Sequence, residues 1–119
     1  MSFKQTIPLN ERISESKRIT EKFPNKIPVI AESKDKNLVL KQNKFLVPYD
    51  VTVSYLISFI RNRLTLKSSD AIFLFCDNKL LSGSNLLSSV YEEYKISNKI
   101  TKNSDQFLYI YINKENTFG

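Results

Sequence analysis

The sequence predicts an α+β fold, in which a mixed sheet of four to five strands packs on a helix and a helical segment precedes the sheet. Helical and strand-like patterns alternate along the 119 residues, a length that suits one domain. The last strand-like segment, 106–112, is apolar on both faces, so we expect a central strand covered on both sides. The helical pattern at 10–23 has too thin an apolar stripe to form a core and must dock on one.

The composition argues against an enzyme. The chain has no histidine, which removes the commonest general base and the commonest metal ligand. Its one cysteine, Cys76, lies in the apolar run AIFLFC, where we expect a buried and inert thiol rather than a nucleophile. We find no metal-ligand spacing and no glycine-rich phosphate loop. We therefore expect no catalytic residue, no metal site and no cofactor.

Cysteine usage and charge bear on location and partners. A lone cysteine forms no internal disulfide and favours a reducing compartment, so we expect the cytoplasm. No run has the length of a membrane span, and the N-terminus lacks a signal-peptide core. The net charge is +6, and residues 1–44 carry ten Lys and Arg against five Asp and Glu. Such a segment attracts nucleic acid, anionic lipid or acidic peptide, or simply keeps the protein soluble.

The N-terminal helix is expected over 10–23, with Asn10 as its N-cap and Pro24 as the residue that stops it. We expect this helix to show most of its surface to water, because few of its side chains are apolar. Its thin stripe consists of Ile13, Ile19 and Phe23, with Ser16 between them.

Two strands are expected next, at 26–32 and 44–49, joined by a polar, hairpin-like connection at 33–43. Pro28 has no N–H for the ladder, so we expect it at a strand start, a bulge or an unpaired edge position. Pro48 closes the second strand.

The clearest helical pattern covers 52–64, with Thr52 as its N-cap. Leu56 and Phe59 lie beside the main stripe and make the apolar arc wider than one sheet face usually covers. Two interpretations stay open, a wide core stripe or an apolar spill into a surface groove. The main stripe consists of Val53, Ile57, Ile60 and Leu64.

The rest of the chain predicts a strand at 71–76, a turn at Asp77–Asn78 with a returning strand, and a helix capped by Ser84. A polar loop follows at 96–105, before the last strand. The helix stripe consists of Leu87, Val90, Tyr91 and Tyr94.

The expected order is therefore a helical N-terminal piece followed by ββαββαβ. Residues 1–25 would pack on the core as an extension, 26–112 would form the core, and 113–119 would be a flexible C-terminal tail. We expect one structural domain overall.

Eight segments, in this order and spacing over about residues 11–119, resemble the autophagy ubiquitin-like modifiers of the GABARAP type. No single segment is decisive, but the series is highly specific. The resemblance implies a ubiquitin-like β-grasp fold with an N-terminal helical extension. The segments are EKFPNKIPVI (21–30), KFLVP (44–48), DVTV (50–53), IRNRL (60–64), AIFLF (71–75), YEEYK (91–95), FLYIYI (107–112) and ENTFG (115–119).

The resemblance implies conjugation through the C-terminus. Ubiquitin-like activating and conjugating enzymes would pass the Gly119 carboxylate to phosphatidylethanolamine, with Phe118 as their recognition handle. Glycine suits this role because, without a Cβ, it passes a narrow channel and leaves its carbonyl open to attack. The protein would then reside on autophagosome or related vesicle membranes. A processing or deconjugating cysteine protease is also implied, because many family members carry residues after the glycine; none follow Gly119 here, so either no trimming is needed or this is the mature form. The alternative to conjugation is a frayed terminus that ends in glycine by chance.

The resemblance also implies capture of receptors that carry aromatic-x-x-aliphatic motifs, added as a strand to a sheet edge. Arg63 would contact an acidic residue of the peptide. The aromatic pocket would consist of Glu15, Ile19, Pro28, Lys44, Leu46 and Phe107, and the aliphatic pocket of Phe45, Val47, Pro48, Val51, Leu56 and Phe59. Plain packing is the alternative role for each of them.

Three features depart from the pattern. The lysine cluster usual before the edge strand is diluted to Lys41-Gln42-Asn43-Lys44, Phe45 stands where tyrosine is common, and the loop 96–105 is longer than usual and has no assigned role.

Two other functions compete with lipid conjugation: conjugation to a protein lysine, and a basic nucleic-acid-binding module. We prefer lipid conjugation, and we expect a monomer in solution that binds no nucleic acid.

Overall fold

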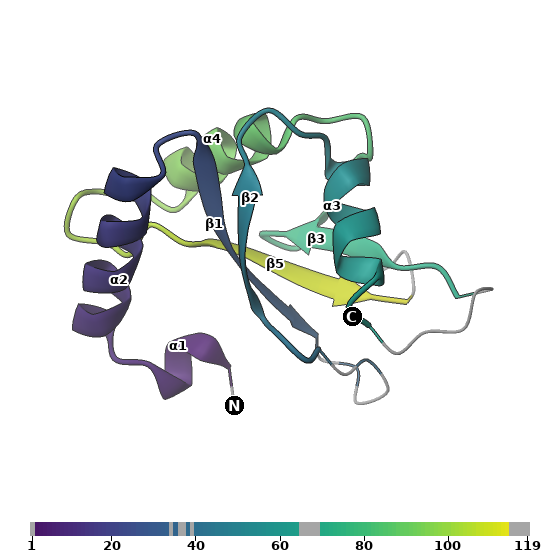
Figure 1. Cartoon of the computed structure of the whole chain (residues 1–119), viewed down its shortest axis with the longest axis horizontal. Helices are drawn as coiled ribbons and strands as arrows, with labels where there is room; N and C mark the ends of the chain where they lie inside the picture. Colours follow the sequence, from purple (N-terminus) through teal and green to yellow (C-terminus); the bar gives the residue numbers. More distant parts are fainter. Residues whose placement is uncertain (1, 34, 36–37, 39, 65–69, 115–119) are drawn as a thin grey trace.

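The computed structural model describes residues 2–33, 35, 38, 40–64 and 70–114. Its strands form one five-stranded mixed sheet, and its helices lie at both ends of the sheet and across its faces (Figure 1). The N-terminal helices lie at one end of the molecule and the helix after the second strand lies toward the other (Figure 1). In chain order the elements are α1 (Phe3–Thr6), α2 (Leu9–Lys22), β1 (Lys26–Ser33), β2 (Lys44–Pro48), α3 (Val53–Arg61), β3 (Phe73–Cys76), β4 (Lys79–Leu80), α4 (Leu87–Ser97) and β5 (Leu108–Asn113).

The sheet has the strand order β2-β1-β5-β3-β4, with β5 in the middle. β1 pairs antiparallel with β2 and parallel with β5, and β5 pairs antiparallel with β3. The predicted mixed sheet, its α+β class and the central position of the last strand are thereby confirmed.

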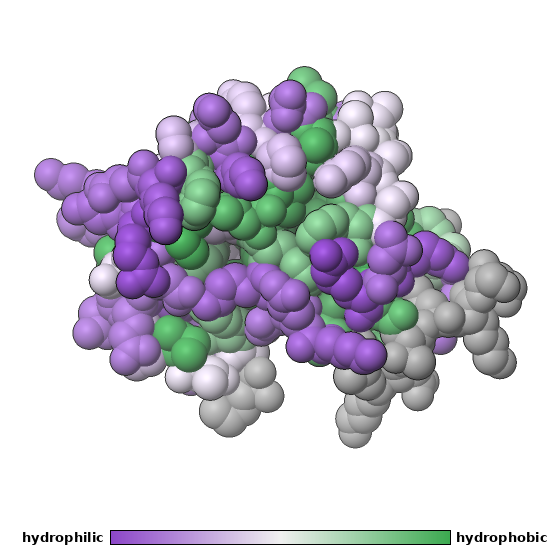
Figure 2. Space-filling view, viewed as in Figure 1, coloured by the Kyte–Doolittle hydropathy of each residue, from purple (hydrophilic) through white to green (hydrophobic). Residues whose placement is uncertain are grey.

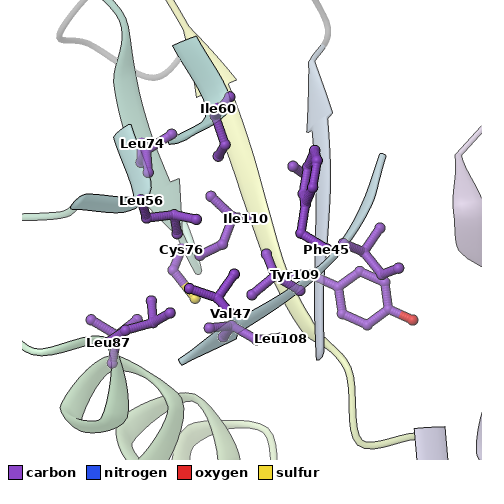
Figure 3. Close-up of a cluster of buried hydrophobic side chains, with 14 of the residues drawn as sticks. Phe45, Val47, Leu56, Ile60, Leu74, Cys76, Leu87, Leu108, Tyr109 and Ile110 are labelled. Carbon is purple, nitrogen blue, oxygen red and sulfur yellow. The ribbon is translucent and has the colours of Figure 1, made fainter. Parts of the chain in front are cut away.

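Both faces of β5 are buried, but by different partners. Leu108 and Ile110 point into the cluster formed with α3 and α4, whereas Tyr109 points away from it (Figure 3). On that second face the Phe3 ring lies 5.4 Å from the Phe107 ring and 6.4 Å from the Tyr109 ring, between centroids. The N-terminal segment therefore covers the second face of β5, as expected of a segment that must dock on the core.

The N-terminal segment differs from the prediction in two ways. A short helix, α1, precedes the predicted one, and it begins at a capping box in which Ser2 and Gln5 bond reciprocally. The next helix begins at Leu9 rather than after Asn10, because the Pro8 carbonyl already accepts the first helical hydrogen bonds. It ends at Lys22, before Pro24 as predicted.

Pro28 lies near the start of β1, opposite Leu46 in β2. Tyr49 N donates to Asn25 O and Ala31 N to Asn43 O, so the odd-numbered residues of β1 bond to β2. By alternation Pro28 faces the other way, and there the β5 ladder begins only at Val29. The missing N–H therefore costs no ladder bond, which fits the first of the three predicted positions, a place near the strand start.

Helix α3 is capped by Thr52 as predicted, but it turns a different stripe to the core. Val53, Leu56 and Ile60 are fully buried, whereas Ile57 is only half-buried. Leu56 is thus a core residue rather than part of an apolar surface groove. The buried stripe is centred about one residue away from the predicted one. The helix also ends at Arg61, short of position 64.

The β3–β4 hairpin has the predicted turn, with φ of 51° at Asp77 and 64° at Asn78. Positive φ at both central residues is the geometry that matches the twist of a tight hairpin. Helix α4 begins at Leu87 instead of being capped by Ser84. The reason is tertiary, since Leu86 pairs with Thr52 in an isolated bridge that keeps the chain extended up to the helix.

The ends of two strands also shift, since β3 begins at Phe73 rather than at position 71 and β5 begins at Leu108 rather than at position 106. In the second case Gln106 N donates to Ser16 Oγ and Phe107 N donates to Asp105 Oδ1. These amides are therefore unavailable for the ladder. β5 also extends to Asn113, the first residue of the predicted tail.

Candidate functional site

β2 is an edge strand, because the strand order gives it a single neighbour, β1. Its odd-numbered residues bond to β1, so the backbone groups of Lys44, Leu46 and Pro48 point outward. The Gln42 side chain donates to the outward carbonyl of Lys44 at 2.7 Å. Such an edge is a template on which an extended peptide can add as a further strand.

The surface between β2 and α2, here called the α2 flank, contains the six residues predicted for an aromatic pocket. Lys44, Leu46 and Pro28 share one sheet face, and Lys44 Nζ forms an ion pair with Glu15 of α2. Phe107 is fully buried on that same side, where Phe3 packs on it. Figure 2 shows hydrophobic surface between α2 and α3, with hydrophilic side chains around it. The residues that remain half-exposed are Glu15, Ile19, Lys44 and Leu46.

Phe3 belongs to this flank and was missed by the sequence reasoning. Its ring packs on Phe107, and Lys44 Nζ lies 5.6 Å from the ring centroid, a cation–π arrangement. Its backbone N donates to Glu32 Oε2 at 2.9 Å, which fixes α1 to β1. The spacing of Ser2 and Gln5 was the available signal, since serine followed three residues later by glutamine marks a helix start.

The surface between β2 and α3, here called the α3 flank, has a floor made of core residues. Phe45, Val47 and Leu56 are between 0% and 4% exposed, so they support the surface without offering much of it. The half-exposed members of the predicted aliphatic pocket are Pro48, Val51 and Phe59, but by strand alternation Pro48 shares the sheet face of Lys44 and Leu46. A side chain docked on the α3 flank would therefore contact chiefly Val51 and Phe59.

Arg63 closes the rim of the α3 flank. Its guanidinium carbon lies 3.7 Å from the Phe59 ring centroid, and Nη1 donates to the Phe59 carbonyl at 2.9 Å. Phe59 in turn meets Phe45 edge-on at 5.4 Å and stacks with the exposed Tyr55 at 6.5 Å. This places a positive charge at the edge of an apolar surface, where an acidic side chain of a ligand could pair with it.

A buried polar network fixes α2 to β5. The Asp105 carboxylate accepts hydrogen bonds from Arg12 Nη1 at 2.6 Å, from the Tyr109 hydroxyl at 2.9 Å and from Phe107 N at 3.1 Å. Burial raises the pKa of Tyr109 well above its ordinary value; the hydrogen bond from Arg12 opposes this shift, and the Asp105 charge adds to it. The network holds the helix that carries Glu15 and Ile19 over the sheet.

The predicted conjugation residues, Phe118 and Gly119, lie outside the described residues. The strand that leads to them, β5, ends at Asn113, and Lys114 forms an ion pair with Asp70 at 3.5 Å. The C-terminal end of β5 lies at the opposite side of the molecule from α2 (Figure 1). The start of the tail and the α2 flank are thus well separated.

Neither of two groups that often carry chemistry, a reactive thiol or a metal cluster, is found among the described residues. Cys76 is a buried core residue as predicted, and burial, with Asp77 and Glu93 nearby, raises the pKa of its thiol to about 12. A thiol in this state is a poor nucleophile at neutral pH. No group of three or more potential metal-ligating side chains gathers anywhere in the described ranges. Among the helices described, none is long and apolar enough to span a membrane.

Comparison with known proteins identifies the family. The family model described as "Autophagy protein Atg8 ubiquitin like" matches residues 11–119. This chain belongs to the Atg8 ubiquitin-like family. Among Atg8 relatives, Autophagy-related protein 8 of Vanderwaltozyma polyspora is 42% identical over 99% of this chain and 96% of its own length. Autophagy-related protein 8a of Arabidopsis thaliana is 42% identical over 99% and 93%.

The solved structures agree with the family assignment. The crystal structure of Trypanosoma brucei ATG8 superposes with a TM-score of 0.83 at 29% identity, covering 100% of this chain and 98% of that one. The expected family and the ubiquitin-like fold with its N-terminal helical extension are thereby confirmed. The role of each predicted pocket residue in this Atg8 family member stays a prediction.

Proposed function

We propose that this protein is a ubiquitin-like autophagy modifier that is conjugated through Gly119 to phosphatidylethanolamine and recruits receptors with aromatic-x-x-aliphatic motifs. Membership of an autophagy family supports the first part, as does the C-terminal sequence ENTFG. The attached lipid would supply the membrane anchor, since each buried CH₂ contributes about 0.8 kcal/mol. The protein itself would act as a modifier and scaffold and contribute no catalytic group.

The observation that carries the receptor-binding part is the edge strand β2 between two different flanks. A peptide that pairs with the outward groups of Lys44 and Leu46 would point alternate side chains to the α2 and α3 flanks. An aromatic ring fits beside Leu46 and Ile19, with Lys44 available for a cation–π contact. An aliphatic side chain fits on Phe59, with the guanidinium of Arg63 near an acidic neighbour.

The peptide site is tested with Leu46→Ala and a synthetic peptide that carries an aromatic-x-x-aliphatic motif with an acidic flank. We expect the variant to weaken binding by roughly 1–3 kcal/mol, as for an interface anchor, in isothermal titration calorimetry. Leu80→Ala is the matched control, because Leu80 is 49% exposed and lies in β4 at the opposite edge of the sheet. Equal losses in both variants, or no binding by the parent protein, would count against the site.

The conjugation step is tested with activating and conjugating enzymes, ATP and phosphatidylethanolamine liposomes. The parent protein and Leu46→Ala should give a faster-migrating lipidated band on a urea gel, whereas Gly119→Ala should not. Conversely, Gly119→Ala should bind the motif peptide normally. If both substitutions reduce both activities equally, the proposed separation of the two functions is wrong.

The same assays separate the competing functions. A heavy protein adduct in place of the lipidated band would indicate conjugation to a protein lysine. Binding to single-stranded nucleic acid that falls steeply with salt, in a protein that ignores the motif peptide, would indicate a nucleic-acid-binding module.

A further inference from the structure

A hollow of about 380 Å³ lies beside α2, between the helix and the segment that joins α4 to β5. Ile13, Lys17 and Thr20 recur every three or four residues and so lie on one side of helix α2. Glu15 and Ile19 lie on the opposite side of the helix, toward β2, so the hollow is separate from the predicted aromatic pocket. In Figure 1 the α4–β5 connection runs along the outer side of α2. The lining residues are Ile13, Lys17, Thr20, Glu21, Ile100, Thr101, Lys102, Ser104 and Gln106.

The hollow has an apolar floor and a preformed wall. Ile13 and Ile100 are half-buried, and Ile100 packs against the hydrophobic core. Gln106 Nε2 donates to the carbonyls of Thr101 and Ser104, both at 2.9 Å, which fixes the turn of the connection in place. The wall therefore stands without a ligand, and the longer polar loop noted in the sequence is the element that builds it.

The rim of the hollow is positively charged. Lys17 and Lys102 form no ion pair within the part of the chain that the structure describes, and Glu21 is the only acidic residue among the lining residues. Both ammonium groups are thus available to carboxylates of a ligand. Complementary charges at a rim raise the association rate and fix the register of a bound partner.

We propose that this hollow is a second docking site, for an acidic peptide segment that inserts one branched aliphatic side chain between Ile13 and Ile100. The carboxylates of the segment pair with Lys17 and Lys102. The apolar floor selects the aliphatic residue, and the two lysines select its acidic neighbours. The site acts independently of β2, so one partner can occupy it while a motif peptide occupies the edge strand.

The first test is an NMR titration of the full-length, ¹⁵N-labelled protein with the probe acetyl-EELEE-amide. We expect amide shifts concentrated at Ile13, Ile100 and Lys102. The matched peptides acetyl-EEAEE-amide and acetyl-KKLKK-amide should bind at least about fivefold more weakly, because each lacks one of the two required features. Shifts spread over the whole basic surface, or equal binding of the three peptides, would overturn the proposal.

Charge reversal gives the second test. Lys17→Glu combined with Lys102→Glu should weaken the EELEE peptide at least about fivefold, whereas Lys79→Glu, on exposed β4, should change its affinity less than twofold. Because these positions are exposed, the variants should fold, which the NMR spectrum checks. The double variant should still bind the aromatic-x-x-aliphatic peptide within twofold of the parent protein. A failure of the β2 site would therefore be visible separately from a failure of this one.

Two other occupants are distinguished by the same spectra. Shifts at the hollow with oligothymidylate but none with the peptide would assign it to nucleic acid. Line broadening at the hollow that grows with protein concentration would assign it to a second copy of the chain. Either result would overturn the peptide assignment.

Discussion

Asp105→Asn is the substitution that should most clearly reveal how α2 is attached. The side chain is almost fully buried and accepts hydrogen bonds from Arg12, Tyr109 and Phe107. Asparagine keeps the size but carries no charge, and one end of its amide donates instead of accepting. The variant therefore leaves the Arg12 side chain, which is only 12% exposed, without its counter-charge.

The magnitude follows from that burial. Removing one member of a buried ion pair costs about 3–5 kcal/mol, because the remaining charge stays desolvated. Arg12 keeps a second hydrogen bond, from Nε to the Ile7 carbonyl at 3.0 Å, so we expect the lower end, about 3 kcal/mol. Against a typical total stability of about 5–15 kcal/mol, this is a large fraction. The melting temperature should fall by roughly 10 °C.

Urea unfolding monitored by circular dichroism measures the loss, with Asp50→Asn as the control because Asp50 is exposed. The control should change the free energy of unfolding by less than about 0.5 kcal/mol. The double variant with Arg12→Met should lose less than the sum of the two single variants, because no unpaired charge remains. A loss below about 1 kcal/mol for Asp105→Asn, or strict additivity in the cycle, would refute the reasoning.

Three further outcomes follow from burial. Phe3→Ala should lower the free energy of unfolding by about 3–5 kcal/mol because the ring is buried against Phe107, whereas Leu9→Ala, at an exposed position, should have little effect in the same assay. Cys76, whose pKa burial raises to about 12, should resist iodoacetamide at pH 8 in the native protein and react in urea; rapid native alkylation, followed by mass spectrometry, would contradict the packing. Burial also raises the pKa of Tyr91 to about 12 from 10.0. Because the unfolded chain loses the Tyr91 hydroxyl proton more readily, the contribution of this group to the free energy of unfolding is complete below pH 10 and should be lost as the pH rises toward 12. Tyr91→Phe should therefore lessen the fall in the free energy of unfolding that urea titrations measure across that range.

Local patterns were enough to predict most of the fold. Apolar residues on both faces of the last strand predicted its central place, and Thr52 marked the start of α3 correctly. Errors arose where tertiary contacts decide. α4 starts after Leu86 because that residue pairs with Thr52, and the core side of α3 is set by how the helix lies on the sheet. Neither cause can be read from a local window.

The candidate site, too, was only partly predictable from the sequence. The pocket residues came from the resemblance, and the structure places them on the two flanks of one edge strand. Phe3 was missed because a four-residue helix carries little periodic signal. The pairing of Arg12 with Asp105 was missed because the partners are 93 residues apart, and nothing in either local sequence indicates the other.

The position of α2 depends on a small polar side chain at its centre, where a larger one would lift the helix off the sheet. Ser16 is fully buried, accepts a hydrogen bond from Gln106 N at 2.8 Å and donates to the Arg12 carbonyl at 2.7 Å. The helix is therefore located by directional bonds, and its half-buried apolar residues, Ile13 and Ile19, are left on opposite flanks. One side of the helix borders the edge strand, and the other borders the hollow beside the α4–β5 connection. Any substitution that loosens this central attachment, Asp105→Asn included, should thus weaken motif peptides without touching a single peptide contact.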